Sequence, residues 1–169
     1  MENNGLTNDS LYTQLEAKFS DNTISSREDQ FGLLTVEISS EKIIEVIKWL
    51  KEEKSINYLT LIGAVHYPEN EGREYAVVYH LHSLTENFRI RLKAFLSKNH
   101  LSIASLTTLF VGANWMERET FDFYGVNFKG HPNMKRILNE DSMDYHPMRK
   151  EYQLEDATRE DKDDTYFGR

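Results

Sequence analysis

Apolar and polar residues follow two different periods along the first hundred residues, and these periods predict the secondary structure. Apolar side chains at 11, 12, 15 and 19 have close to helical spacing and predict a short helix over residues 11–19. Residues 21–30 are polar and are expected to form a loop, whereas residues 31–38 alternate as a half-buried strand does. The next segment, from about 41 to 54 with Ser40 as its cap, has the i, i+3, i+4, i+7 stripe of an amphipathic helix. The apolar positions of this stripe are Ile43, Val46, Ile47 and Leu50.

Three β-prone segments follow and predict neighbouring strands. Residues 58–67 are almost entirely apolar, as in a central strand, and a turn at 71–73 leads into the equally β-prone residues 74–84. Residues 88–93 then alternate between apolar and basic side chains. No glycine-rich phosphate loop follows any of these segments, since Gly63 stands alone, so the sequence does not support a Rossmann or Walker nucleotide site.

The period becomes helical again after Ser105, which is a suitable helix cap, and Gly125 suits the residue that ends a helix. Gly112 is expected to weaken the middle of this helix by about 1 kcal/mol, or to divide it into two shorter helices. Together the elements predict an α+β domain over residues 1–125. We expect this domain to contain a mixed sheet of about four strands with helices packed on it, with the elements in the order α-β-α-β-β-β-α.

Residues 126–169 show neither period and predict a long, extended C-terminal arm. The arm contains apolar residues and repeats one pattern: His131-Pro132 and, fifteen residues later, His146-Pro147 each precede a Met and two adjacent cations. Each proline biases its histidine to an extended backbone and removes a hydrogen-bond donor. Ordering such a segment costs about 1–2 kcal/mol per residue, which only extensive contact offsets. We therefore expect residues 126–169 to wrap a partner protein.

Composition excludes several classes of function. The chain has 169 residues, 39% of them apolar, which suits one soluble domain, and no apolar run approaches the ~20 residues that span a bilayer. The N-terminus resembles neither a signal peptide nor a transit peptide, so a cytoplasmic location is expected. The absence of cysteine excludes disulfides, thiolate catalysis, and Cys-ligated zinc or iron–sulfur clusters.

The charge is concentrated at the two ends of the chain. The net charge is −8, of which residues 1–30 and residues 151–169 carry −4 each, while residues 31–150 are neutral. This pattern predicts a balanced folded body with solvated or partner-held termini. It argues against nucleic acid as a partner, because phosphate binding depends on Lys and Arg.

A second face of the helix after Ser105 is polar, with Trp115, Arg118, Glu119 and Asp122 at i, i+3, i+4 and i+7. One interpretation is a solvated face, in which an Arg118–Asp122 pair contributes only about 0.3 kcal/mol. A second is a charged network between chains, in which each buried charge depends on its partner. A third is catalysis by Glu117 and Glu119.

The six histidines raise two metal-site hypotheses. His80 and His82 lie on one face of a predicted strand, but the sequence places no third ligand beside them. His131, His146 and Glu119 are the residue types of a His/His/carboxylate site, which would make the chain a stand-alone metal-dependent hydrolase. Core or surface packing of the histidines explains the same residues without a metal.

The sequence from Trp115 to Phe128, WMERETFDFYGVNF, resembles the hallmark stretch of the 30-kilodalton-type subunit of NADH–quinone oxidoreductase, respiratory complex I. The resemblance continues through GHPNMKRIL at 130–138 and HPMRK at 146–150, and it covers residues 105–154. Two parts depart from the family pattern: the link at 140–145, where family members commonly have an aromatic and a glycine and this chain has EDSMDY, and the acidic stretch at 155–169.

The resemblance implies a peripheral-arm subunit of the proton-translocating enzyme, on the cytoplasmic side of a bacterial inner membrane and associated with that membrane only through the complex. It implies packing against the quinone-site subunit, the D-type protein that helps to form the quinone pocket, and against other peripheral-arm subunits. No cofactor is expected in this chain, and FMN and iron–sulfur clusters are expected in partner subunits. Close relatives occur in photosynthetic NDH complexes and in membrane-bound hydrogenases, and a generic adaptor outside bioenergetics is a further alternative. The predicted partner-interface residues are Trp115, Glu117, Arg118, Glu119, Asp122, His131, Pro132, Lys135, Arg136, His146, Pro147, Arg149 and Lys150.

Overall fold

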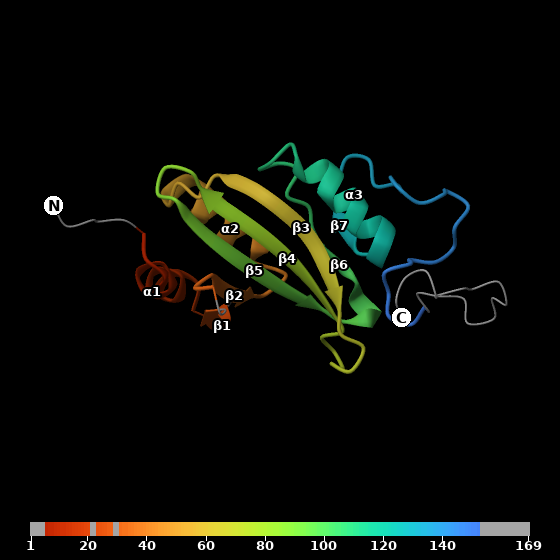
Figure 1. Ribbon diagram of the computed structural model, residues 1–169, viewed down its shortest axis with the longest axis horizontal. Coiled ribbons are helices and arrows are strands. Elements are labelled where there is room, and N and C mark those ends of the chain that lie inside the picture. The colour runs from red at the N-terminus through yellow and green to blue at the C-terminus, as the bar shows by residue number, and fades with distance from the viewer. Residues whose placement is uncertain (1–5, 21–22, 29–30, 153–169) are drawn as a thin grey trace, which may run out of the picture.

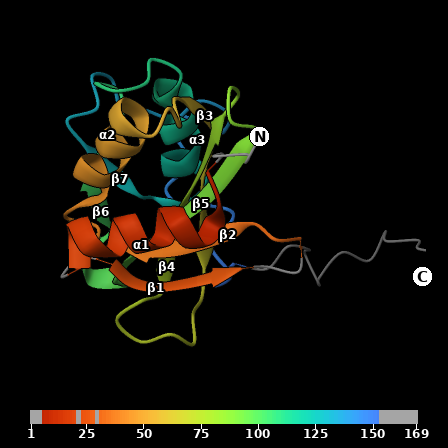
Figure 2. The same cartoon turned by 90° about the vertical axis from the view of Figure 1, so that its left-hand side faces the viewer.

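The computed structural model describes residues 6–20, 23–28 and 31–152, which form a mixed five-stranded sheet with α2 and α3 on one face (Figures 1 and 2). The strands lie in the order β1-β2-β5-β4-β3, and β6 pairs with β7 in a separate two-stranded sheet. The helices are α1, Asn8–Phe19; α2, Ile43–Glu53; the 3-10 helix η2, Lys98–His100; and α3, Ala113–Tyr124. The strands are β1, Thr23–Glu28; β2, Leu34–Ile38; β3, Tyr58–His66; β4, Tyr75–Ser83; β5, Phe88–Leu96; β6, Ser102–Ala104; and β7, Asn127–Lys129.

The sheet is mixed because α2 carries the chain across it. After β2, the chain crosses through α2 to β3 at the opposite edge and returns through the antiparallel strands β4 and β5. β5 therefore arrives parallel to β2, with Leu34 opposite Ile90. A parallel pair needs such a crossover, whereas antiparallel neighbours need only a tight turn. The predicted α+β class and mixed sheet are confirmed.

The core lies between the sheet and its helices. The stripe predicted for α2 is confirmed, since its four apolar residues, Ile43, Val46, Ile47 and Leu50, are fully buried. They face alternate strand residues such as Val77 and Leu92, which are also fully buried. α1 adds Leu11 and Leu15 to this core, and its last residue, Phe19, meets Trp49 of α2 edge-on at 5.8 Å.

Two predictions in the first half of the chain are wrong. Residues 23–28 form β1 rather than part of a loop, because they pair antiparallel with β2 at the edge of the sheet. Ser40 does not cap α2, because a turn in which the Lys42 N–H donates to the Ser39 carbonyl at 3.1 Å precedes the helix. The helix begins at Ile43, and Lys42 at its N-cap makes no side-chain capping bond.

The helix predicted from Ser105 is shorter than its apolar spacing suggests. Residues 106–112 form turns, in which the Phe110 N–H donates to the Leu106 carbonyl at 2.9 Å, and α3 begins after Gly112. The predicted end is confirmed: Gly125 has a φ of 78°, and its N–H donates to the Phe121 carbonyl at 2.7 Å. The short strands β6 and β7 have no recognisable sequence pattern.

The C-terminal segment, residues 130–152, contains turns but no helix or strand and runs beside α3 (Figure 1). This part of the predicted arm packs on its own chain, although the sequence predicted that residues 126–169 would wrap a partner protein. Its backbone and side chains form many hydrogen bonds to α3 and β3. The remainder of the predicted arm, 153–169, lies outside the described residues.

Candidate functional site

Three charged side chains of α3 are buried rather than solvated, whereas Trp115 and Glu119 of the same helix are exposed. Glu117 and Asp122 have no exposed surface, and Arg118 is 8% exposed. Buried charged groups require hydrogen-bonding partners, because the desolvation of an unpaired charge is costly. These residues find their partners in two places: the loop before α3 and the C-terminal segment after it.

Glu117 attaches α3 to the loop before it. One carboxylate oxygen accepts from the Ser105 hydroxyl at 2.7 Å, and the other accepts from the Leu106 N–H at 2.6 Å. Burial raises the pKa of Glu117, although these two hydrogen bonds oppose the shift. Ser105 is therefore a hydrogen-bond donor to the Glu117 carboxylate and not the helix cap that the sequence predicted.

Asp122 fixes the path of the C-terminal segment. Its Oδ2 accepts from three successive backbone N–H groups, those of residues 137, 138 and 139, at 3.1, 2.8 and 2.9 Å. Its Oδ1 accepts from Nη1 of Arg136 at 2.7 Å. Burial acts to raise the pKa of Asp122, but these backbone N–H groups and the Arg136 guanidinium together hold that pKa well below its usual range.

Arg136 extends the same network to the next turn of the segment. Its Nη2 donates to the carbonyls of Met143 and Tyr145, at 2.7 and 2.9 Å. Arg118 also binds the segment, since Nε donates to the Lys135 carbonyl at 3.1 Å and Nη2 donates to the Arg136 carbonyl at 2.9 Å. The Arg118–Asp122 pair suggested by the i, i+4 spacing is thus wrong, because Asp122 pairs with Arg136 instead.

Both histidines of the His-Pro repeat bond to α3. Nε2 of His131 lies 3.1 Å from the Asn114 carbonyl, while its Nδ1 accepts from the Asn133 N–H at 3.0 Å. Nδ1 of His146 lies 2.9 Å from the Asp122 carbonyl, to which it must donate. Within the part of the chain that the structure describes, no group of three His, Asp or Glu residues is placed to hold a metal ion.

The end of the segment packs closely over Gly125. A Cβ atom at this position would lie 2.7 Å from His146 and closer still to the guanidinium of Arg149. Arg149 donates from Nε to the Tyr124 carbonyl at 2.8 Å. Glycine is required at position 125 for two reasons: its φ is positive, and the approach of His146 and Arg149 leaves no room for a Cβ atom.

His66 is a member of the site that the sequence did not indicate. It ends β3, is 4% exposed, and accepts from the Lys150 N–H through Nδ1 at 3.0 Å. No motif includes His66, and only its position at the end of an apolar strand distinguishes it. The contact joins residues that are 84 positions apart.

The predicted interface residues therefore divide into two groups. Seven use their side chains to make the hydrogen bonds within the chain described above: Glu117, Arg118, Asp122, His131, Arg136, His146 and Arg149. Five are exposed: Trp115, Glu119, Pro132, Lys135 and Lys150. Pro147 belongs to neither group and is partly buried.

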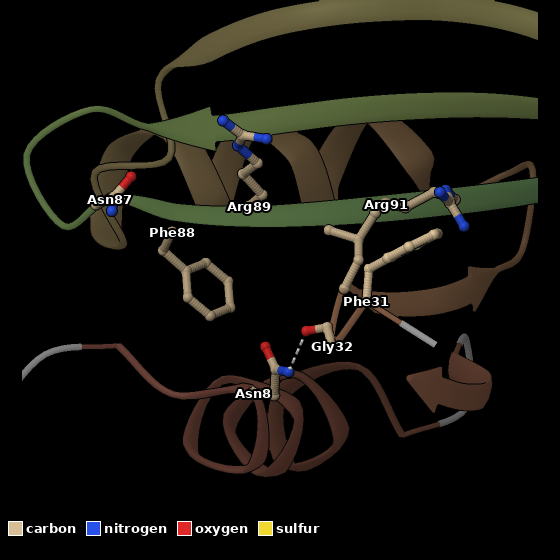
Figure 3. Close-up of a pocket in the computed structure, with 8 residues that line it drawn as sticks. Asn8, Phe31, Gly32, Asn87, Phe88, Arg89 and Arg91 are labelled. Carbon is tan, nitrogen blue, oxygen red and sulfur yellow. Dashed lines mark hydrogen bonds between the residues drawn. The ribbon is translucent and has the colours of Figure 1, made fainter. Parts of the chain in front are cut away.

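A separate hollow of about 620 Å³ lies between α1 and the start of β5 (Figure 3). Asn8 donates from Nδ2 to the Gly32 carbonyl at 2.9 Å at one side, and Arg89 and Arg91 lie on the strand opposite (Figure 3). Among the described residues that line it there is no carboxylate and no histidine. Those lining residues do not supply an acid–base pair.

None of the helices in the described ranges is long and apolar enough to cross a membrane.

The chain matches one protein family over most of its length. Residues 36–158 match the family described as respiratory-chain NADH dehydrogenase, 30 Kd subunit. The C-type subunit of the NADH-quinone oxidoreductase of Citrifermentans bemidjiense is 40% identical over 153 residues, which cover 90% of this chain and 94% of the relative.

Two solved structures are similar to this fold. The first is described as the trypsin-resistant fragment (1–134) of Nqo5; it is 27% identical, with a TM-score of 0.65, over 73% of this chain and 98% of that one. The second belongs to the membrane-bound sulfane sulfur reductase, an archaeal respiratory membrane complex. It is 21% identical, with a TM-score of 0.74, over 86% of this chain and 85% of that one, and it shows the fold alone.

Proposed function

The chain belongs to the 30-kilodalton subunit family of the respiratory-chain NADH dehydrogenase, and we propose that it braces the subunit that forms the quinone site without supplying catalytic residues. The observation that carries the proposal is the family match over residues 36–158, which spans the sheet from β2 onward and the network around α3. The chain is thus a peripheral-arm subunit of NADH–quinone oxidoreductase, as the resemblance of its α3 region implied. The comparisons do not support a stand-alone hydrolase.

The non-catalytic role is supported by the contacts of the buried charges. Glu117 accepts two hydrogen bonds from the loop before α3, and Asp122 accepts four from the C-terminal segment. A general acid or base must reach a substrate proton. Carboxylates that are fully buried and already hydrogen-bonded in this way suit a structural function.

We place the partner contact on the exposed side of α3 and the adjoining segment, called here the α3 face. It consists of Val111 in the turn before α3, Trp115 and Glu119 on α3, and Lys135 and Leu138 in the segment, and its three apolar residues are 88%, 60% and 65% exposed. Exposed Trp beside Arg is typical of the centre of a protein interface, and the Arg118 guanidinium lies 5.2 Å from the Trp115 ring. The occupant we propose is the quinone-site subunit.

The remaining parts of the enzyme are assigned to other chains. Since the sequence has no cysteine, we place the iron–sulfur clusters, together with FMN, in partner subunits. Ubiquinone or menaquinone would bind at the neighbouring quinone-site subunit. We propose that the chain reaches the cytoplasmic side of a bacterial inner membrane through these partners.

Mild solubilisation of membranes from cells that carry the tagged full-length chain tests this function. Subunits that hold the quinone site and the iron–sulfur clusters should be isolated with it, together with NADH–quinone activity. Isolation of the chain alone, or with proteins outside respiration, would contradict the proposal. The non-catalytic role has its own test: Glu119→Gln should leave the turnover of each assembled complex unchanged, and lost turnover with intact assembly would disprove it.

A further inference from the structure

The C-terminal segment is attached to the end of the sheet through one histidine acceptor. The Lys150 N–H donates to Nδ1 of His66 at 3.0 Å. The His66 ring lies flat on the ring of Tyr75 from β4, with centroids 4.3 Å apart and planes 4° apart. Because this stacking and burial fix the ring, Nδ1 has a defined orientation towards the segment.

This hydrogen bond requires a neutral His66. A backbone N–H can only donate, so Nδ1 must present a lone pair and the ring proton must be on Nε2. A protonated imidazole carries a proton on both nitrogens and has no acceptor left. Uptake of one proton therefore removes the acceptor of the Lys150 N–H.

Burial and the cations around His66 also disfavour its protonation, whereas Glu151 favours it. The Arg149 guanidinium lies 5.6 Å from the Tyr75 ring, and Glu151 accepts from Lys98 at 3.4 Å and pairs with Arg149 at 3.5 Å. Burial lowers the pKa of His66; nearby Glu151 opposes this shift, and the surrounding cations add to it. The groups that face His66 are Tyr75 from β4, Lys98 from η2, and Arg149, Lys150 and Glu151 from the segment.

We propose that the His66–Lys150 contact is a pH-sensitive attachment of the Lys150 backbone to the end of β3, formed while His66 is neutral and lost when His66 is protonated. Since the folded-state pKa of His66 is lowered, the stability it contributes is present above the ordinary pKa of 6.5 and is lost as the pH falls through the lowered value.

The other two histidines of the segment behave differently. His146 donates from Nδ1 to the Asp122 carbonyl, and it still donates when it is protonated. His131 accepts from the N–H of Asn133, two residues along the chain, so this bond lies within a local turn and does not attach the segment to the sheet. His146 is therefore a matched control for His66.

A titration of the full-length, ¹⁵N-labelled chain by NMR tests the attachment. Between about pH 8 and about pH 5, the Lys150 amide signal should titrate with the same midpoint as the His66 ring. Over the same range, the protection of the Lys150 amide from hydrogen exchange should fall. This loss should be roughly tenfold for each pH unit by which the attachment lowers the pKa of His66. In the His66→Asn variant, the side-chain oxygen replaces Nδ1 without titrating, so the Lys150 signal should be independent of pH. His146→Asn should leave the Lys150 titration as in the wild type.

A further variant tests the attachment at neutral pH. His66→Phe retains an aromatic ring against Tyr75 but has no acceptor, so Lys150 should lose its protection at every pH while the amide signals of β4 and β5 remain. If His66→Asn fails to fold, the wild-type titration and the His66→Phe variant together still test whether His66 holds the Lys150 backbone. A Lys150 amide that does not follow His66, or that stays protected in His66→Phe, would overturn the proposal.

Discussion

Asp122 Oδ1 and Arg136 Nη1 lie 2.7 Å apart, and this ion pair joins the last turns of α3 to the C-terminal segment. Both side chains are shielded from solvent, at 0% and 11% exposed. The same carboxylate also accepts hydrogen bonds from three backbone N–H groups. One side chain of α3 therefore orders four successive residues of the segment, 136–139. The pair explains how a segment without periodic sequence acquires a defined path.

Asp122→Asn should destabilise the folded chain by about 3–5 kcal/mol, because it leaves the Arg136 guanidinium buried without its counter-charge. Unfolding in urea, followed by circular dichroism, measures this change. Glu119→Gln on the exposed side of the same helix is the control, with an expected change within about 0.5 kcal/mol. Equal stability of the two variants would mean that the network around Asp122 does not stabilise the isolated chain.

Gly125→Ala should also destabilise the chain, by about 1–2 kcal/mol from the left-handed backbone alone. The contact of the new methyl group with His146 and Arg149 adds to this cost. Gly112→Ala provides a matched control, since its φ is −63° and no atom lies within 4 Å of its Cβ position. That control should be neutral or stabilising by about 0.4–1 kcal/mol. Similar thermal midpoints for the two variants would contradict the close approach at Gly125.

Much of the fold follows from the periods in the sequence. The stripe of α2 and the alternation of the strands after it report burial directly, because each side chain contacts a neighbouring element of the sheet or core. β1 gives no such signal, because all its residues except Ile24 are polar and its place depends on hydrogen bonds to β2. Residues 106–112 continue a helical apolar pattern, yet their backbone forms turns.

The site was harder to predict than the fold. The sequence identified the residue types, including Asp122 and Arg136, but not their pairing. The pairing depends on the path of the chain after α3, where Gly125 and Gly130 both have positive φ values. His66 belongs to no motif, and only the three-dimensional approach of Lys150 shows its role.

The buried carboxyl group of Glu117 should give stability an unusual dependence on pH. Because burial raises its pKa, the folded state binds this proton more tightly than the unfolded state does. The corresponding stability is present below the ordinary pKa of 4.5 and is lost as the pH rises through the raised value. Glu117→Gln removes the titration and can still bond to Ser105 and Leu106, so its stability relative to the wild type should improve as the pH rises. Urea unfolding of both proteins at several pH values measures this difference, and a constant difference would contradict it.

Trp115→Ala should separate partner binding from folding. The Trp115 side chain is 60% exposed, so its removal should cost the isolated chain no more than about 1 kcal/mol, mainly through the lost contact with Arg118. At the centre of an interface the same truncation typically costs about 2 kcal/mol or more, which is about a 30-fold loss of affinity. Tyr58→Ala is the control, because Tyr58 is 51% exposed but begins β3, outside the α3 face. Isolation of tagged chains from solubilised membranes should recover far fewer partner subunits with Trp115→Ala than with Tyr58→Ala. Equal recovery with both variants would place the partner elsewhere on the molecule.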